Sequence, residues 1–414
     1  MSQPDVSRFM EQLLDEVEVE WKPLAEIGEL VRGNGLPKKD FTNVGVPAIH
    51  YGQIYTYYAL STTATISFVS IETAKKLRKV NKGDVVITNT SENLEDVGKA
   101  LVYLGEQQAV TGGHATIFKP SEIVIGKYFA YFSQTEVFAK EKRRYAKGTK
   151  VIDVSATDMA KIIIPIPCPD NPKKSLEIQA EIVRILDAFT AMTAELTAEL
   201  NLRQQQYNHY RDQLLSFEDG EVEWKTLGEI AEYSKKRVSS EVLDESNYVG
   251  VNNLLQNRAG KTESDHVPTE GNSTGYSYND ILIGNIRPYL KKIWHADRDG
   301  GTNGDVLVVH LTDSAVIPRY LYQVLADDKF FEYNMQHAKG AKMPRGSKPK
   351  ILEYLVPIPS KKEQARIVAI LDKFDTLTTS ITEGLPREIE LRQRQYEYYR
   401  DFLLSFPKSD TEAA

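Results

Sequence analysis

Apolar residues recur every three or four positions along two long stretches of the chain, and this spacing predicts two long helices. The first stretch covers residues 175–217 and the second covers residues 360–406. The apolar positions are Ile182, Leu186, Phe189, Met192, Leu196, Leu200, Tyr207, Tyr210, Leu214 and Phe217, then Ile367, Leu371, Phe374, Leu377, Ile381, Tyr396, Tyr399, Leu403 and Phe406. Such a seam is typical of paired, coiled-coil-like helices. At 1.5 Å per residue the first helix would be roughly 60 Å long, which indicates a spacer.

Polar residues and breakers mark the ends of these helices. Ser360 with Glu363 three positions later forms a capping-box pattern, and Ser175 is the expected cap of the first helix. Gly384 and Pro386 interrupt the second stretch but have no counterpart in the first. We therefore expect the second helix to end or kink there, while the first runs on.

The chain is a duplication of one unit. Residues 179–187 (QAEIVRILD) return as residues 364–372 (QARIVAILD), and residues 207–217 (YNHYRDQLLSF) return as residues 396–406 (YEYYRDFLLSF). Three shorter blocks also repeat. They are VEWK at 19–22 and 222–225, AKGTK at 146–150 with AKGAK at 338–342, and IPIP at 164–167 with VPIP at 356–359. A chain with such repeats must be interpreted as two copies of a globule followed by a helix.

The two globules combine strand-like runs with helical aromatic stripes. Residues 84–87 and 116–118, like residues 280–283 and 306–311, read as strands. Each globule is expected to contain one long amphipathic helix, whose aromatic and aliphatic stripe favours core packing over base stacking. The stripes are Tyr128, Phe129, Tyr131, Phe132, Val137 and Phe138, and Tyr320, Leu321, Tyr322, Val324, Phe330 and Phe331.

These elements predict an α+β fold. Two α/β globules, residues 18–168 and 221–359, are separated and joined by two long antiparallel helices, residues 169–220 and 360–414, in an internal pseudo-twofold repeat. Residues 1–17 form a further helical segment. Within the first long helix the tetrapeptide TAEL occurs twice in tandem at residues 193–200, and each copy is worth about one turn, or about 6 Å.

Composition narrows the class of protein. The chain has 414 residues, of which 41% are hydrophobic and 26% charged, as in a globular multidomain protein. A single cysteine, Cys168, excludes an internal disulfide and fits a reducing cytoplasm, and no apolar run is long enough to span a membrane. Phosphate loops, dinucleotide fingerprints, amino-methyltransferase motifs and nucleophile elbows are missing. The chain is therefore not expected to be an enzyme by itself.

Local clusters of positive charge indicate a polyanionic ligand, although the net charge of the chain is −7. Two basic clusters occupy matching places after the helical stripes, and each has a net charge of +5. The candidate DNA-binding residues are Lys140, Lys142, Arg143, Arg144, Lys147 and Lys150 with His114 in the first globule, and Asn285, Arg287, Lys291, Lys292, Lys339, Lys342, Arg345 and Lys348 in the second. Arg287 is suited to guanine, Asn285 to adenine, and lysines to phosphates. The segment that matches Asn285–Lys292 in the first globule is far less basic, which predicts that the globules read different sequences.

The helical repeats, the VEWK and IPIP blocks and the tandem TAEL resemble the specificity (S) subunit of a type I restriction-modification system, most closely its IC class. The resemblance implies a non-catalytic cytoplasmic subunit whose two globules each bind one half of a bipartite double-stranded DNA site. It also implies that the helices set the distance between half-sites and dock two modification (M) subunits, to which restriction (R) subunits are added. S-adenosylmethionine would then belong to the M subunit, and ATP and Mg²⁺ to the R subunit, with no cofactor in this chain.

The resemblance also suggests which residues form the spacer and its docking surface. They are Phe189, Leu196, Leu200, Tyr207, Tyr210, Phe374, Ile381, Tyr396 and Tyr399. Two other functions stay open on the residues alone: a coiled-coil scaffold whose globules bind proteins, and an orphan DNA-binding regulator. The DNA sequence that is recognised and the length of the gap do not follow from the sequence.

Overall fold

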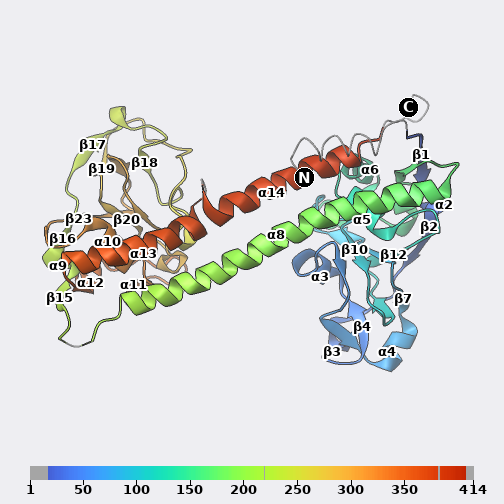
Figure 1. Ribbon diagram of the computed structural model, residues 1–414, viewed down its shortest axis with the longest axis horizontal. Coiled ribbons are helices and arrows are strands. Elements are labelled where there is room, and N and C mark those ends of the chain that lie inside the picture. Colours follow the sequence, from blue (N-terminus) through green and yellow to red (C-terminus); the bar gives the residue numbers. More distant parts are fainter. Residues whose placement is uncertain (1–16, 219, 381–382, 407–414) are drawn as a thin grey trace. The chain divides into compact units, whose positions relative to one another are not determined.

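The computed structural model describes residues 17–218, 220–380 and 383–406, and the chain separates into two compact units (Figure 1). Unit 1 contains residues 1–192 and 393–414, and unit 2 contains residues 193–392. Each unit therefore combines a globule with parts of the long helices, so the helices are not separate domains. The expected N-terminal helical segment lies outside the described residues apart from Val17, and Ile381 is also outside them.

The first globule is built on two five-stranded sheets. One has the strand order β2-β12-β8-β10-β5 and the other β3-β6-β4-β11-β7. The bounds of the first are β2 Gly28–Arg32, β12 Ala115–Pro120, β8 Val85–Thr88, β10 Ala100–Tyr103 and β5 Ser61–Thr62. Those of the second are β3 Phe41–Thr42, β6 Ser67–Val69, β4 Val46–Ile49, β11 Ala109–Thr111 and β7 Arg78–Val80. Two further pairs join β1 (Val19–Pro23) to β14 (Ile163–Pro167) and β9 (Thr90–Ser91) to β13 (Ile152–Asp153).

The second globule repeats this plan with shorter sheets. Its sheets have four strands each, in the orders β16-β23-β20-β21 and β17-β19-β22-β18. The bounds are β16 Ala231–Tyr233, β23 Val306–Leu311, β20 Ile281–Gly284, β21 Ile293–His295, β17 Arg237–Ser239, β19 Asn272–Tyr276, β22 Gly300–Thr302 and β18 Tyr248–Val249. The pair β15 (Glu223–Thr226) and β24 (Leu355–Ile358) closes this globule as β1 and β14 close the first.

The four strands expected from the sequence are confirmed as β8, β12, β20 and β23, and the structure adds how they pair. Strand β8 pairs antiparallel with β12, and β20 pairs antiparallel with β23. Every residue of β8 and β20 is buried, because both strands lie inside their sheets with covered faces. Small helices complete the globules: α2 (Leu24–Ile27), α3 (Tyr51–Thr56), α4 (Ile71–Lys76), α7 (Ala156–Met159), α9 (Leu227–Ile230) and α12 (Lys348–Leu352). The α+β class is confirmed.

The single long helix expected in each globule is wrong. The first stripe is divided between α5 (Gly126–Phe132) and α6 (Glu136–Tyr145), and the second between α10 (Pro318–Leu325) and α11 (Asp328–Gln336). Thr135 and Asp327 stand at the breaks, and the side chain of each accepts a backbone N–H from the following turn, which starts a new helix. The aromatic stripe nevertheless packs in the core as expected, with Tyr128, Phe129 and Tyr320 fully buried.

The first long helix, α8, runs without interruption over Pro172–Leu214, 43 residues (Figure 1). Its cap is Asn171, whose side chain accepts the N–H of Lys174, and not Ser175 as expected. Pro172 fits the first helical position, and no glycine or proline follows inside the helix. None of the residues from 187 to 206, including both TAEL copies, is buried. The middle of α8 therefore has no buried side chain, although the half-buried Phe189 packs against the core of the first unit.

The second long helix is broken where the sequence predicts. Helix α13 (Lys361–Thr379) begins at Ser360, whose side chain accepts the N–H of Glu363, and α14 covers Gly384–Leu403. Gly384 has φ 79°, and a Cβ there would lie 2.4 Å from the carbonyl oxygen of Thr376. Only glycine fits this position, so the break between α13 and α14 is fixed by the chain.

Two glutamines of the repeated block QAxIVxILD attach the helices to the globules. The buried Gln179 side chain accepts the N–H of Ile125 and donates to the carbonyl of Ile123, both at 2.9 Å. The equally buried Gln364 makes the matching bonds, at 2.8 and 3.1 Å, to the loop before α10. A buried amide with both ends paired fixes the position of a loop, which explains why this residue is repeated.

The aspartate of the same block is a second attachment in unit 1. The carboxylate of Asp187 accepts from the Lys127 ammonium and from the Tyr131 hydroxyl, both at 2.7 Å. Lys127 and Tyr131 lie on α5, so α5 is held against α8 by a charged and a neutral hydrogen bond.

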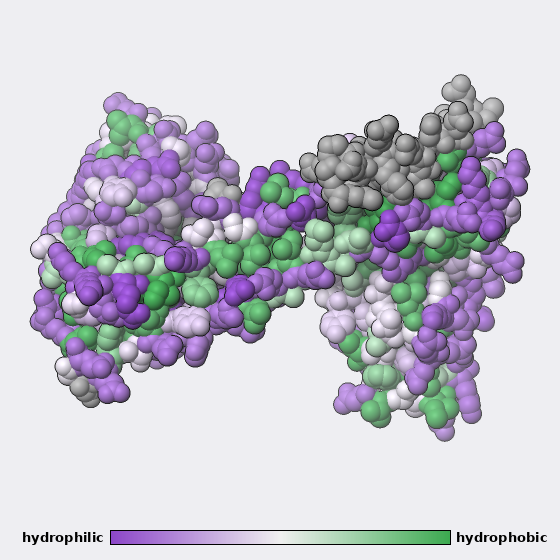
Figure 2. Space-filling model, in the orientation of Figure 1, coloured by the Kyte–Doolittle hydropathy of each residue, from purple (hydrophilic) through white to green (hydrophobic). Residues whose placement is uncertain are grey.

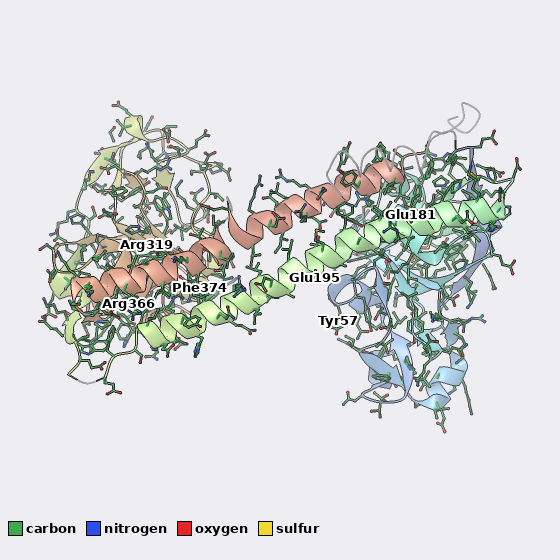
Figure 3. The ribbon with its side chains drawn as sticks, viewed as in Figure 1. Tyr57, Glu181, Glu195, Arg319, Arg366 and Phe374 are labelled. Atoms are coloured by element: carbon green, nitrogen blue, oxygen red, sulfur yellow. The ribbon has the colours of Figure 1, made fainter. Side chains whose placement is uncertain are left out.

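In unit 2 the matching Asp372 accepts from Arg319 and from Gln323, both at 2.8 Å, and Arg319 also binds Asp375 at 2.7 Å (Figure 3). Burial alone would lower the pKa of Arg319, but Tyr322 and the two carboxylates outweigh it and hold the pKa above its ordinary value. The guanidinium is therefore always charged and depends on both aspartates.

Candidate nucleic-acid interface

The basic cluster of the first globule falls in two places. It was expected to follow the helical stripe, but its first four cations lie inside α6, and the last two lie in the loop beyond it. The cations on α6 are Lys140, Lys142, Arg143 and Arg144, and those in the loop are Lys147 and Lys150. All except Lys142 are exposed.

Lys142 is part of the core of the first globule rather than of a DNA-binding surface. Its residue exposure is 5%, and its ammonium donates to the carbonyls of Val97 at 2.5 Å and Glu95 at 3.1 Å. Burial and the neighbouring Arg143 lower its pKa to about 8. Gly98 leaves the room for this side chain, since a Cβ there would lie 2.8 Å from it. We therefore remove Lys142 from the candidate DNA-binding residues.

Neighbouring carboxylates pair with three of the exposed cations. Arg143 lies 3.1 Å from Glu136, and Arg144 lies 3.3 Å from Glu141. Lys147 lies 2.9 Å from Asp158. Only the pair of Arg143 with Glu136 is exposed on both sides, so a phosphate can replace that carboxylate at small cost. The carboxylates of Glu141 and Asp158 are buried, whereas the cations that they bind are exposed. Lys140 and Lys150 have no ion-pair partner in the part of the chain that the structure describes.

His114 stands in a small group of polar and aromatic side chains. Its Nδ1 lies 3.2 Å from the Thr90 hydroxyl, and its ring centroid lies 4.8 Å from that of Tyr51, which in turn contacts His50. Arg32 donates to the carbonyl just before His114 at 3.2 Å. The side chain of His114 is exposed, so the group offers a cation, ring faces and hydrogen-bonding atoms on one surface.

Sequence reasoning missed Tyr51 and Arg32 as neighbours of His114. A signal for Tyr51 was present, because it closely follows β4 as His114 follows β11, and these strands pair in parallel. The carboxyl ends of parallel strands meet at the same edge of a sheet. The pairing itself, which joins residues about 60 positions apart, is not evident from periodicity.

In the second globule Asn285 and Arg287 are separated by burial. Asn285 has an exposure of 7%, and its side-chain oxygen has no hydrogen-bond partner. Arg287, two residues later, is exposed with φ 52°, and its N–H donates to the carbonyl of Pro344 at 2.7 Å. Tyr289 beside it is 50% exposed. Arg287 and Tyr289 can therefore reach a ligand, whereas Asn285 cannot in this arrangement, and the adenine contact expected of Asn285 is not supported.

The next two lysines are turned toward the protein. The ammonium of Lys291 lies 2.8 Å from Asp328, and that of Lys292 donates to the carbonyl of Val251 at 2.7 Å. Burial lowers the pKa of both. Their first role is structural, and their availability to phosphates is smaller than the sequence suggests.

The remaining candidate DNA-binding residues of the second globule are all exposed cations. Arg345 lies 3.0 Å from Asp305, in an exposed pair. Lys339, Lys342 and Lys348 have no ion-pair partner among the described residues. The basic cluster of this globule is therefore less neutralised by its own chain than that of the first.

The two globules also differ in the space beside their helix breaks. Unit 1 has a cavity of about 540 Å³ whose lining includes Glu136 and Arg400. In unit 2 the residues at the matching places are Asp328 and Arg211. There the guanidinium of Arg258, on a loop of the second globule, binds Asp328 and the carbonyl of residue 326. An arginine thus stands in the second globule where the first has a cavity.

Five aromatic residues of the expected spacer and docking surface pair the two long helices with each other. In unit 1 the rings of Phe189 and Tyr399 stack at 5.3 Å. In unit 2 Phe374 stacks on Tyr207 at 5.9 Å and on Tyr210 at 5.4 Å (Figure 3). These five side chains therefore hold the two long helices together, and Tyr210 among them is 42% exposed. Their part in a spacer or in docking a partner stays a prediction.

The other expected spacer residues differ in burial, and Tyr396 is buried at 9% exposure. The Tyr396 hydroxyl donates to Gln134 at 2.6 Å, which joins α14 to the first globule. Leu196 and Leu200 are half-buried on α8. Exposed apolar side chains lie elsewhere on the helices, and hydrophobic surface is visible there in Figure 2. These side chains are Met192, Leu202, Tyr210, Leu391 and Tyr398.

His295 makes the second globule sensitive to acid. Burial, with a contribution from Arg319, lowers the pKa of His295 to about 4, and its Nε2 is buried without a partner. Between about pH 6.5 and 4 the unfolded chain binds a proton that the folded chain does not, so stability falls as pH falls through this window. We expect a loss of the order of 2 kcal/mol. Chemical denaturation at several pH values gives the free energy of unfolding as a function of pH. Its slope between about pH 6.5 and 4 should be flatter for His295→Phe than for the unaltered chain, and unchanged for the exposed control His266→Asn.

Within residues 17–218, 220–380 and 383–406 no group of His, Cys, Asp and Glu side chains is placed to hold a metal ion. The helices of the same residues include none that is long and apolar enough to cross a membrane.

The family model for the type I restriction modification DNA specificity domain matches residues 16–203 and 220–391. The chain is 36% identical to the specificity subunit of the type I restriction enzyme EcoR124I/EcoR124II of Escherichia coli, over 97% of this chain and 98% of that protein. It is 32% identical to the specificity subunit of the EcoprrI enzyme of the same organism, over 91% and 92% of the two chains.

Solved structures share the fold. The crystal structure of the S subunit of a type I restriction-modification system from M. genitalium matches with a TM-score of 0.57 at 15% identity, covering 95% of this chain and 98% of that one. A chain from a structural study of complex assembly in a type I restriction-modification system matches with a TM-score of 0.52 at 13% identity, covering 93% and 97%.

Proposed function

Because the chain belongs to the family of type I restriction-modification DNA specificity subunits, we propose that it selects the bipartite DNA sequence on which such a system acts. The observation that carries the proposal is the duplicated unit. In each unit a globule with exposed cations is fastened to the long helices by the same buried glutamine and the same aspartate. Two fastened globules with different surfaces suit two different half-sites in a fixed order.

The proposed DNA-contacting residues are those with exposed side chains. They are Lys140, Arg143, Arg144, Lys147, Lys150 and His114 in the first globule, and Arg287, Lys339, Lys342, Arg345 and Lys348 in the second. The open hydrogen-bonding surface differs between the globules: His114 with Tyr51 and Arg32 in one, Arg287 with Tyr289 in the other. Such different side chains favour different bases, so the half-sites should differ in sequence.

In this proposal the long helices set the gap between half-sites, and the tandem TAEL favours the IC class. The exposed apolar side chains of the helices favour docking of two M subunits, with R subunits added to the complex. The chain itself is non-catalytic. S-adenosylmethionine belongs to the M subunit, and ATP and Mg²⁺ to the R subunit. A DNA target and a single free cysteine favour the cytoplasm.

Salt dependence separates this function from a protein-binding scaffold. We expect the complex of the full chain with its modification subunit to lose affinity for duplex DNA by about 10³-fold or more between 50 and 200 mM salt, as for proteins with at least six phosphate contacts. Fluorescence anisotropy with labelled duplexes measures this. A nearly flat dependence would favour the scaffold, and steep binding without any preferred sequence would favour an orphan DNA-binding protein.

A further inference from the structure

One loop has the same structure in both globules, although their sheets differ. Residues 147–153 and 339–345 each form a seven-residue loop closed by an antiparallel bridge, Lys147 to Asp153 and Lys339 to Arg345. Two backbone hydrogen bonds close each bridge, at 3.0 and 2.8 Å in the first globule and at 2.9 Å both times in the second. We call these the paired loops.

The paired loops share the conformation of their glycine and the burial of the position before the closing residue. Gly148 has φ 104° and Gly340 has φ 102°. A Cβ on Gly148 would lie 2.1 Å from a carbonyl oxygen across the loop, so a larger residue there would change the turn. The position before the closing residue, Ile152 or Pro344, is buried in both loops. A duplicated glycine with the same left-handed conformation indicates a shape that both globules need.

Both paired loops are fixed to the same edge of their globule. The carbonyl of Asn89 accepts the N–H of Val154 at 2.9 Å, and the carbonyl of Asn285 accepts the N–H of Gly346 at 3.1 Å. The strand residues that follow, Thr90 and Ile286, pair with the closing residues of the loops. Each paired loop therefore lies beside the surface proposed to read bases, which holds Thr90 with His114 in one globule and Arg287 in the other.

The tips of the paired loops present a lysine followed by an apolar residue. Lys150 is followed by Val151, 59% exposed, and Lys342 by Met343, 50% exposed. Neither lysine has an ion-pair partner in the described part of the chain. An apolar side chain held in water next to an unpaired cation gains nothing in the free protein, so a ligand with an anionic and an apolar face is the better explanation.

The two half-sites are proposed to differ in sequence, but both have the same sugar-phosphate backbone. We propose that the paired loops bind this backbone in both half-sites, with Lys150 and Lys342 on phosphates and Val151 and Met343 against deoxyribose. The inference rests on the proposed function. It assigns the positioning of the DNA to features that both globules possess, and the reading of its sequence to features that differ between them. A protein surface is a less suitable ligand for both loops, because it does not present repeated phosphates as the DNA backbone does.

The test uses the complex of the full chain with its modification subunit. We expect Lys150→Ala and Lys342→Ala each to weaken binding about 3- to 10-fold at 100 mM salt, for cognate and unrelated duplexes alike, and to reduce the slope of log affinity against log salt by about 0.9. Val151→Ser and Met343→Ser should weaken binding of both kinds of duplex without changing the slope. The preference for the cognate duplex should stay within about twofold in all four variants.

Lys82→Ala and Lys235→Ala are matched controls, because both lysines are exposed and pair only with a neighbouring carboxylate. They should leave affinity and slope unchanged. Three results would overturn the inference: unaltered binding in the Lys150 and Lys342 variants, a change in sequence preference with an unaltered slope, or a defect in assembly with the modification subunit while the assembled complex binds DNA normally. If the unaltered complex itself shows no salt-dependent binding to DNA, the proposed function fails instead.

Discussion

Deleting one of the two TAEL copies, residues 197–200, is expected to abolish methylation at the original DNA site and to create a new site with a shorter gap. Four helical residues rise about 6 Å, which corresponds to about one to two base pairs of duplex. Both half-sequences should be kept, because no residue of either globule changes. Methylome sequencing of cells that contain the variant and its modification subunit would show the motif directly.

The exposure of the TAEL copies supports this expectation. No residue of the two TAEL copies, 193–200, is buried or belongs to either core, so shortening α8 in this stretch removes no core packing from either globule. Glu195 lies exposed on the helix in this stretch (Figure 3). The fastening residues Gln179 and Asp187 lie before it.

A variant of the same length separates the effect of length from that of sequence. Replacing Thr197 by Ala removes only a hydrogen bond to the carbonyl of Thr193 in the same helix and should leave the gap unchanged. An unchanged gap after the deletion, in a stable and active complex, would refute the idea that α8 sets the distance between half-sites.

Asp372→Ala is expected to destabilise the second globule by about 3 kcal/mol. The substitution leaves the half-buried guanidinium of Arg319 with Asp375 alone and leaves the Gln323 side chain without its acceptor. Loss of one partner of a largely buried charge costs far more than loss of an exposed pair. Denaturant unfolding of the full chain would give the change in the free energy of unfolding.

Asp212→Ala is the control for a carboxylate on the surface of a long helix, and we expect a change within about 0.5 kcal/mol. Arg319→Met with Asp372→Ala should recover part of the loss, since no buried charge is then left unpaired. If Asp372→Ala and Asp212→Ala had equal effects, the aspartate of the repeated block would not be an attachment between helix and globule.

Much of the architecture could be predicted because it is repeated. The long helices, the break at Gly384 and the strands β8, β12, β20 and β23 all follow from periodicity, breakers and duplication. The duplicated Gln179 and Gln364 were visible in the sequence too. Their role was not, because a glutamine on a helix shows nothing of the loop that it binds.

The individual site residues were harder to predict, and burial is the reason. Lys142 looks like one more cation in a basic run, yet it is turned inward under Gly98 and binds two carbonyls. Asn285 looks like a base-reading residue, yet its place beside a central strand encloses it. A cation or amide near a helix end is read correctly only when the packing around it is known.

The breaks within the globule helices show a different limit. Thr135 and Asp327 lie in an otherwise continuous helical stripe, and each interrupts it by capping the next turn. Capping residues are also common on helix surfaces, so the spacing of apolar residues outweighed them in the prediction. The cap of α8 was misplaced for a similar reason, because Ser175 and Asn171 are both suitable cap residues and only the start at Pro172 decides between them.

The central claim is that each globule reads one half of a DNA site at a distance set by the helices. Genome-wide mapping of N6-methyladenine, in cells that contain the modification subunit with and without this chain, tests it most directly. We expect a new motif made of two different half-sequences separated by a gap of fixed length, present only with the chain. A stable complex with an active methyltransferase that yields no such motif, or a motif without a gap, would contradict it.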